Sequence, residues 1–154
     1  MKDFARELEH TVDRYEALLR SMSNQQLSEK PNPAKWSRKE ELGHLIDSAQ
    51  ANIRRVVASQ YEQTPKLFYH QDFWVEINGY QNADPSELID LWSMLNRRFC
   101  QIISGLSREA LNRQCDIGRD RIEVVDVEFI IRDYPKHMLH HLHHLLELDP
   151  VSYP

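Results

Sequence analysis

The amino-acid sequence predicts an all-α protein built as a four-helix bundle, and two observations carry that prediction. Apolar residues recur at spacings of three and four along four long segments, as in helices with one buried face. The 154 residues include only four glycines, so long stretches contain no helix breaker. Bundles of this class build metal sites from side chains on facing helices.

The first predicted helix covers about Lys2 to Met22. A polar loop with Pro31 and Pro33 follows it, because proline lacks the backbone N–H that a helix interior needs. The apolar stripe of the helix consists of Phe4, Leu8, Val12, Tyr15, Leu18, Leu19 and Met22.

The second predicted helix begins at Ser37 and runs to about Tyr61. Ser37 and Glu40 form a capping box, in which each side chain can accept a hydrogen bond from an otherwise unpaired backbone N–H. The apolar stripe consists of Leu42, Leu45, Ile46, Ala49, Ile53, Val56 and Val57.

The third predicted helix begins at Asp84 and Pro85, with Asp84 as the N-cap and Glu87 completing a second box. Gly105 lies near its end, where a C-cap is expected. The residues expected to face inward are Leu88, Leu91, Trp92, Leu95, Phe99, Ile102 and Ile103.

The fourth predicted helix runs from about Asp126 to Leu148. Pro135 removes one backbone donor and is expected to kink the helix just before His137. Pro150 ends it. No repeat or linker divides the chain, so we expect a single domain over residues 1–154.

Two connections are longer than simple turns. Residues 63–83 form an aromatic-rich crossover between the second and third helices, and residues 107–123 are polar and fit a short helix or a hairpin. The aromatic residues of the first connection are Phe68, Tyr69, His70, Phe73 and Trp74.

Composition narrows the function classes. The net charge of −5 and the lack of a concentrated basic patch argue against nucleic-acid binding. No apolar run approaches the roughly 20 residues that span a bilayer, and no apolar signal segment opens the chain. Cys100 and Cys115 form neither a CxxC motif nor a disulfide framework, which fits a reducing cytoplasm.

Five of the eight histidines lie within residues 137–144. His137 and His141 are four positions apart, so a helix places both rings on one face, where they could hold a metal ion. At about 100 degrees per residue, both border the apolar stripe of the helix. The spacing fits a solvated, histidine-rich helix end or a loose metal-binding tract equally well.

His44 is the third candidate ligand. On a helical wheel it lies roughly opposite the apolar stripe of its helix, so periodicity alone favours a surface histidine.

The segment from Trp36 to Asp47, Trp-Ser-x-Lys-Glu-x-Leu-Gly-His-Leu-Ile-Asp, resembles the second-helix signature of the DinB-like (YfiT-like) metalloenzyme superfamily. The His-x-x-x-His pair is similar to the signature of that family's fourth helix. The resemblance covers nearly the whole chain and implies an up-down-down-up bundle, a homodimer, and metal ligands His44, His137 and His141. The family pattern often has glutamine where this chain has His144, a substitution that leaves open either a further nitrogen near the site or an altered pocket.

Three neutral imidazoles leave at least one coordination position open, where a water or a thiol could ionise. Zinc or nickel suits the nitrogen set, and iron or manganese stays open. Glu40 and Asp47 lie one helical turn from His44 and are candidates to orient a ligand ring; Asp47 is also a candidate general base. The candidate substrate-pocket residues are Trp36, Arg55, Trp74 and His140, although arginines and aromatics at such positions more often solvate a helix or close a core.

The family resemblance implies a metal-dependent enzyme that joins a low-molecular-weight thiol to a small electrophilic substrate. Bacillithiol, mycothiol and glutathione all fit as the thiol. The alternatives are a metal-dependent hydrolase, a non-catalytic metal-binding or stress-related bundle, and an interaction module with an incidental histidine cluster.

Overall fold

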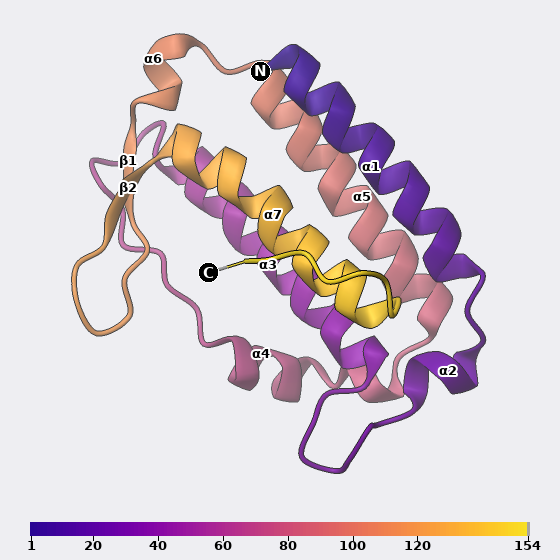
Figure 1. The fold of residues 1–154 in the computed structure, drawn as a ribbon. Coiled ribbons are helices and arrows are strands. Elements are labelled where there is room, and N and C mark those ends of the chain that lie inside the picture. The colour runs from indigo at the N-terminus through magenta and orange to yellow at the C-terminus, as the bar shows by residue number, and fades with distance from the viewer. Residues whose placement is uncertain (154) are drawn as a thin grey trace.

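The computed structural model describes residues 1–153 and contains the four expected long helices (Figure 1). Their bounds are α1 Lys2–Arg20, α3 Arg38–Ala58, α5 Pro85–Ser104 and α7 Val127–Leu145. The predicted starts at Ser37 and Asp84 are confirmed, since both residues cap their helices through side-chain oxygens. The capping box forms at Ser37, whereas the Glu87 side chain does not complete the second box predicted at Asp84. The predicted ends of the first, second and fourth helices were two to three residues too late, a usual error where a helix frays.

Short elements fill the connections: α2 Asn24–Ser28, α4 Gln71–Asn78, the 3-10 helix η1 Tyr80–Asn82, α6 Arg108–Leu111, β1 Gln114–Asp116 and β2 Val124–Asp126. The segment between α5 and α7 thus contains both predicted alternatives, a short helix and a hairpin. The two strands pair antiparallel, with Cys115 opposite Val125.

The four long helices follow the expected up-down-down-up order. In Figure 1, α1 and α7 run in one direction and α3 and α5 in the other. Because α3 and α5 pack side by side and are parallel, the chain between them must return along the whole bundle. Residues 59–84, which include α4 and η1, make that return, so the long crossover is confirmed.

The helix α3 lies at the centre of the bundle, in contact with α5, α7, α2, α4 and η1. Every residue from Glu41 to Ala49 is buried, which means that no face of this stretch meets solvent. Gly43 permits a close approach between α3 and the Tyr80 ring, because a Cβ added there would lie 2.0 Å from Cδ2 of Tyr80.

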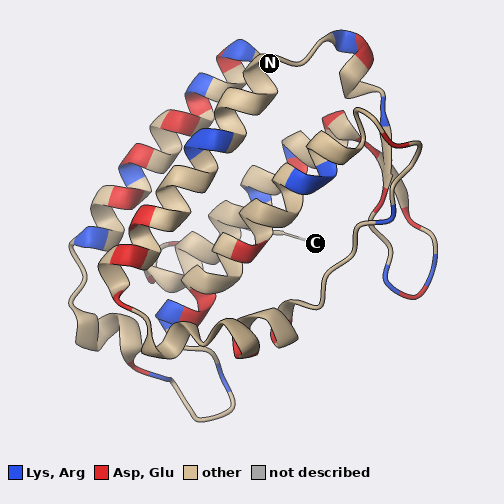
Figure 2. Ribbon diagram, turned by 180° about the vertical axis from the view of Figure 1, so that it is seen from behind, with Lys and Arg blue, Asp and Glu red and all other residues tan. Residues whose placement is uncertain are grey.

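The core is a continuous apolar cluster whose largest fully buried side chains include Trp92, Phe99, Leu45 and Met138. Figure 2 shows acidic and basic residues intermixed along the outer side of α1. None of the helices within residues 1–153 is long and apolar enough to cross a bilayer.

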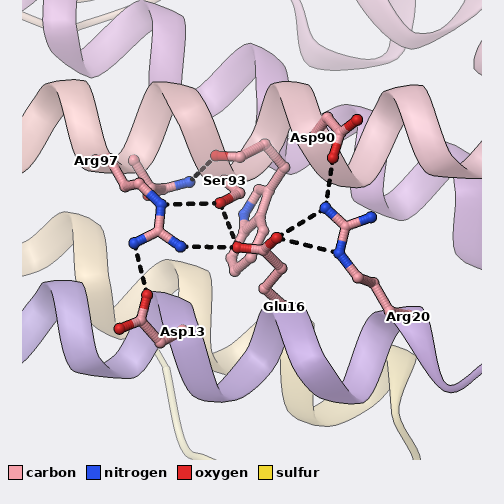
Figure 3. Close-up of polar contacts among 8 residues, drawn as sticks. Asp13, Glu16, Arg20, Asp90, Ser93 and Arg97 are labelled. Atoms are coloured by element: carbon pink, nitrogen blue, oxygen red, sulfur yellow. Dashed lines mark hydrogen bonds and ion pairs between the residues drawn. The ribbon is translucent and has the colours of Figure 1, made fainter.

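A polar network ties α1 to α5 at the edge of the core (Figure 3). The Glu16 carboxylate accepts hydrogen bonds from Ser93 Oγ at 2.5 Å and from Arg97 Nη2 at 2.9 Å. Arg20 bridges Glu16 and Asp90. The Ser93 hydroxyl, followed by the two arginines, lowers the pKa of Glu16, so the carboxylate stays ionised at neutral pH.

The C-terminal segment of the chain packs over α7. Residues 146–153 fold back along this helix (Figure 1). The Nδ1 atoms of His143 and His140 lie 2.6 Å from the Asp149 carbonyl oxygen and 2.9 Å from that of Val151. Pro135 lies inside α7, which continues through it; the kink expected there stays a prediction.

Candidate metal site

Three histidines from two helices converge at the α3–α7 interface. His44 comes from α3, and His137 and His141 come from α7. One ring nitrogen of each lies within 4.8 Å of the others. The Nε2 atoms of His44 and His137 are 3.2 Å apart, and the centroids of the three rings are 4.6 to 5.1 Å apart.

This spacing suits a first-row divalent metal. A tetrahedral ion with metal–nitrogen bonds of ~2.0–2.1 Å would separate two ligand nitrogens by roughly 3.3 Å, close to the observed distance between His44 and His137. Burial first, and then neighbouring rings, lowers the pKa of both His44 and His137 to about 3. At neutral pH both rings are therefore unprotonated, as metal ligation requires.

A buried carboxylate lies directly behind the cluster. Glu41 accepts a hydrogen bond from His141 Nδ1 at 2.9 Å and a second from His144 Nδ1 at 2.8 Å. The first bond fixes the His141 tautomer and leaves its Nε2 free for a metal, which is the usual arrangement behind ligand histidines. His144 thus reaches the site through Glu41.

The rings of His137 and His44 have no carboxylate partner of this kind in the described part of the chain. Ser48 Oγ lies 3.4 Å from His137 Nδ1. The Nδ1 atom of His44 is buried and has no hydrogen-bond partner among residues 1–153.

The prediction that Glu40 or Asp47 orients a ligand ring is wrong. Glu40 completes the cap of α3 and pairs with Lys30, and Asp47 Oδ1 accepts hydrogen bonds from Tyr80 at 2.6 Å and Asn78 at 3.2 Å. Neither bonds to a histidine; Glu41 does. Burial raises the pKa of Asp47 to about 6, while its catalytic role stays a prediction.

The surface position that periodicity favoured for His44 is wrong, since its exposed fraction is 1%. α3 packs against both α5 and α7. His44, on the polar side of α3, contacts His137 and His141 of α7. A helix packed on both sides buries its polar face as well.

An open groove of about 610 Å³ lies on the Glu41 side of the cluster; Glu41 lines it, whereas His44, His137 and His141 do not. Trp36, His140 and His144 line it, and the Trp36 ring lies 5.4 Å from that of His44. Two of the predicted pocket residues, Trp36 and His140, therefore lie beside the histidines.

A smaller cavity of about 160 Å³ reaches His137 from the other side. Arg55, Ser48, Asn52 and Tyr69 are among the residues that line it. The predicted pocket residue Trp74 lines a different hollow, beside Tyr69.

Sequence reasoning missed Glu41 and the inner cavity, although a signal was present. Polar residues recur along α3 with helical spacing, on the side opposite the apolar stripe, at Glu41, His44, Ser48, Asn52 and Arg55. From Glu41 to Ala49, where α3 is buried all round, a row of this kind lines a polar interior site.

Comparison with known proteins places these features in a family. YfiT of Bacillus subtilis strain 168 is 26% identical over 142 residues, which is 92% of this chain and 79% of YfiT. Its structure, described as a probable metal-dependent hydrolase with an unusual four-helix bundle topology, superposes with a TM-score of 0.84 and covers 95% of this chain and 84% of YfiT.

A mycothiol-dependent maleylpyruvate isomerase shares the fold, with a TM-score of 0.69 and 15% identity over 98% of this chain and 60% of the isomerase. The family model of the DinB superfamily matches residues 7–145, which include most of α1, the whole of α3, α5 and α7, and the three clustered histidines. The chain therefore belongs to the DinB superfamily.

Proposed function

We propose that the protein is a divalent-metal-dependent enzyme that joins a low-molecular-weight thiol to a small electrophile. The observation that carries this proposal is the convergence of His44, His137 and His141 with Glu41 hydrogen-bonded behind one of them. Three nitrogen ligands leave a coordination position open, and a metal bound there would lower the pKa of a thiol or water.

The protein's own residues would prepare the site for that chemistry. Glu41 holds the His141 ring, and burial keeps His44 and His137 unprotonated. Trp36 packs near the buried His44, with ring centroids 5.4 Å apart.

Two cavities favour a reaction between two molecules. The open groove beside Trp36 and His140 has the volume of an ordinary small-molecule site, whereas the cavity beside His137 is smaller than such sites. We assign the thiol to the groove and the electrophile to the cavity. The fold is compatible with thiol chemistry, since it also occurs in an enzyme named as mycothiol-dependent.

A metal-dependent hydrolase is the second candidate. The likeness to YfiT over nearly the whole chain favours it, because that protein is described as a probable metal-dependent hydrolase. The same open position would then hold a water. A non-catalytic metal-binding or stress-related bundle is the third candidate, and it needs neither cavity.

The metal site is tested first by metal analysis. Untagged protein is purified without chelator and loaded in turn with zinc, nickel, iron or manganese. We expect about one tightly bound ion per chain, lost in His44→Ala and retained in His10→Ala, whose histidine lies exposed on α1. Several weakly bound ions that His44→Ala leaves unchanged would show that the histidines form a loose tract.

Activity separates the three candidates. Metal-loaded protein is incubated with an activated aryl chloride and bacillithiol, mycothiol or glutathione, and thioether formation is followed. We expect a rate above that of the chelated protein with at least one thiol. Ester hydrolysis without any thiol would favour the hydrolase, and bound metal with neither activity would favour the non-catalytic bundle.

The assembly and location of the protein belong to the same proposal. We expect a homodimer in the cytoplasm, and sedimentation equilibrium of the metal-loaded protein measures the first of these directly. A monomer at all concentrations would refute the dimer.

A further inference from the structure

Arg55 occupies an unusual position on α3, at the far end of the polar row that begins with Glu41. Its Nε donates to the Leu67 carbonyl oxygen at 3.0 Å, and its Nη1 donates to Asn52 Oδ1 at 3.2 Å. A guanidinium carries five N–H donors. The Nη2 group donates to no residue within 1–153.

Within ion-pair distance of this charge the structure describes no carboxylate, and Glu123 attracts it only from farther away. Arg55 takes part in none of the ion pairs among residues 1–153. Burial lowers its pKa from the ordinary value, which shows that the surroundings disfavour the unpaired cation. Mostly buried arginines are usually paired, because an uncompensated charge in a protein interior is costly.

The cavity beside Arg55 has the size and lining for a small polar group. Its volume of about 160 Å³ equals that of roughly five water molecules. Tyr69 lies under the guanidinium, with the ring centroid 6.0 Å from Cζ, and Ser48 and Asn52 add polar groups. His137 of the metal cluster also lines the cavity.

One acidic residue limits what the cavity can hold. Asp133 lines it as well, and its Oδ2 accepts a hydrogen bond from the Tyr153 hydroxyl at 2.6 Å. A ligand with two negative groups would meet this carboxylate. The lining therefore suits a single negative charge placed at Arg55.

We propose that this cavity binds one carboxylate group of the substrate, paired with Arg55, and so presents the substrate to the metal cluster at His137. Arginine binds carboxylates through two parallel N–H groups, which fixes orientation as well as charge. This inference rests on the proposed function, since it makes the electrophile a small monocarboxylate.

The test uses chelator-treated protein, because a carboxylate could otherwise bind to the metal. Propionate is titrated into the wild type, Arg55→Met, Arg55→Lys and the matched control Arg54→Met, and binding is measured by NMR. Arg54 is the adjacent arginine on α3 and is exposed. Propionamide, which has nearly the same shape but no charge, is titrated alongside.

We expect the wild type and Arg54→Met to bind propionate with the same millimolar affinity, and propionamide at least tenfold more weakly. Arg55→Met should lose at least tenfold in propionate affinity, and Arg55→Lys should retain part of it because the charge remains. If Arg55→Met does not fold, two comparisons still test the proposal: Arg55→Lys against the wild type, and propionate against propionamide.

Equal binding of propionate and propionamide, or undiminished propionate binding in the Arg55 variants, would overturn the proposal. So would a wild type that binds neither. Because the titration uses no metal and no thiol, it is independent of turnover. Arg55-dependent binding without thioether formation would refute the enzyme proposal alone.

Discussion

Replacement of Gly43 by alanine tests how tightly α3 is held by the crossover. Glycine inside a helix is less favourable than alanine by about 1 kcal/mol, so on propensity alone Gly43→Ala would stabilise the protein. The structure predicts the opposite, because the new Cβ would lie 2.0, 2.3 and 2.6 Å from three ring atoms of Tyr80. The Tyr80 ring would have to move.

Movement of the Tyr80 ring would cost free energy, because the ring is buried and its hydroxyl is hydrogen-bonded. Tyr80 is 7% exposed, and its hydroxyl donates to Asp47 Oδ1 at 2.6 Å. Overpacking of this kind costs about 1–3 kcal/mol, and loss of a buried hydrogen bond to a carboxyl group costs about 1.5–3 kcal/mol. After the gain of about 1 kcal/mol in propensity, we expect Gly43→Ala to lower the free energy of unfolding by about 1.5–5 kcal/mol.

The assay is a double-mutant cycle in urea, followed by circular dichroism with chelator present. Tyr80→Ala removes the obstructing ring and is destabilising in itself. In that background Gly43→Ala should regain the propensity term and stabilise the protein by about 1 kcal/mol. The sign reversal between the two backgrounds is the signature of a direct clash.

Two results would refute this reasoning. Gly43→Ala that stabilises the otherwise wild-type protein would show that the ring gives way at no cost. Equal destabilisation in both backgrounds would place the cause elsewhere than in Tyr80.

Three further predictions concern the carboxylates and histidines. Glu41→Gln should weaken metal binding about 10–100-fold, as loss of a partner behind a ligand histidine does, whereas Glu40→Gln, which can still cap α3, should not; competition with a chelating dye measures both, and equal losses would remove the role of Glu41. The pKa of Asp47, about 6, is raised above its ordinary value of 3.8, so the folded chain binds this proton more tightly than the unfolded chain and loses stability as pH rises from about 4 through about 6. Asp47→Asn should therefore gain up to about 3 kcal/mol over the wild type at pH 7.5 and nothing near pH 3.5, and a gain that is constant with pH in urea titrations would contradict this. Because the pKa of His44 and of His137 is about 3, zinc binding at pH 6 should release at most about one proton, against roughly two from three histidines of ordinary pKa; calorimetry in buffers of different ionisation enthalpy counts them, and a count of two or more would refute it.

The helices were predictable from the sequence where one face meets solvent. In α1 and α5 the apolar stripes largely coincide with the buried faces, because each helix has an outer side; Leu8, Val12, Trp92 and Phe99 are all buried as expected. The inward position predicted for Leu91 is wrong, since this residue lies at the edge of the stripe and is 43% exposed. The capping signals at Ser37 and Asp84 also proved reliable, since a cap depends only on neighbouring residues.

Hydrophobic periodicity failed to predict the burial of His44 on α3, because it assumes that one face of each helix is exposed to solvent. Burial of the whole stretch from Glu41 to Ala49 follows from packing against elements distant in sequence, which no local pattern contains. His44 was therefore identified only through family resemblance. Glu41 was missed because its partners, His141 and His144, come from α7.

The histidine cluster joins two residues that are 93 positions apart in the chain, His44 and His137. The unfolded chain keeps only the histidines of residues 137–144 close together, so an ion that also needs His44 binds the folded state more tightly. Such an ion would act as a reversible cross-link between α3 and α7. At a free concentration a thousandfold above its dissociation constant it would add about 4 kcal/mol to the free energy of unfolding. The amount of folded protein in a cell would then rise and fall with the supply of the metal, which couples protein turnover to metal nutrition.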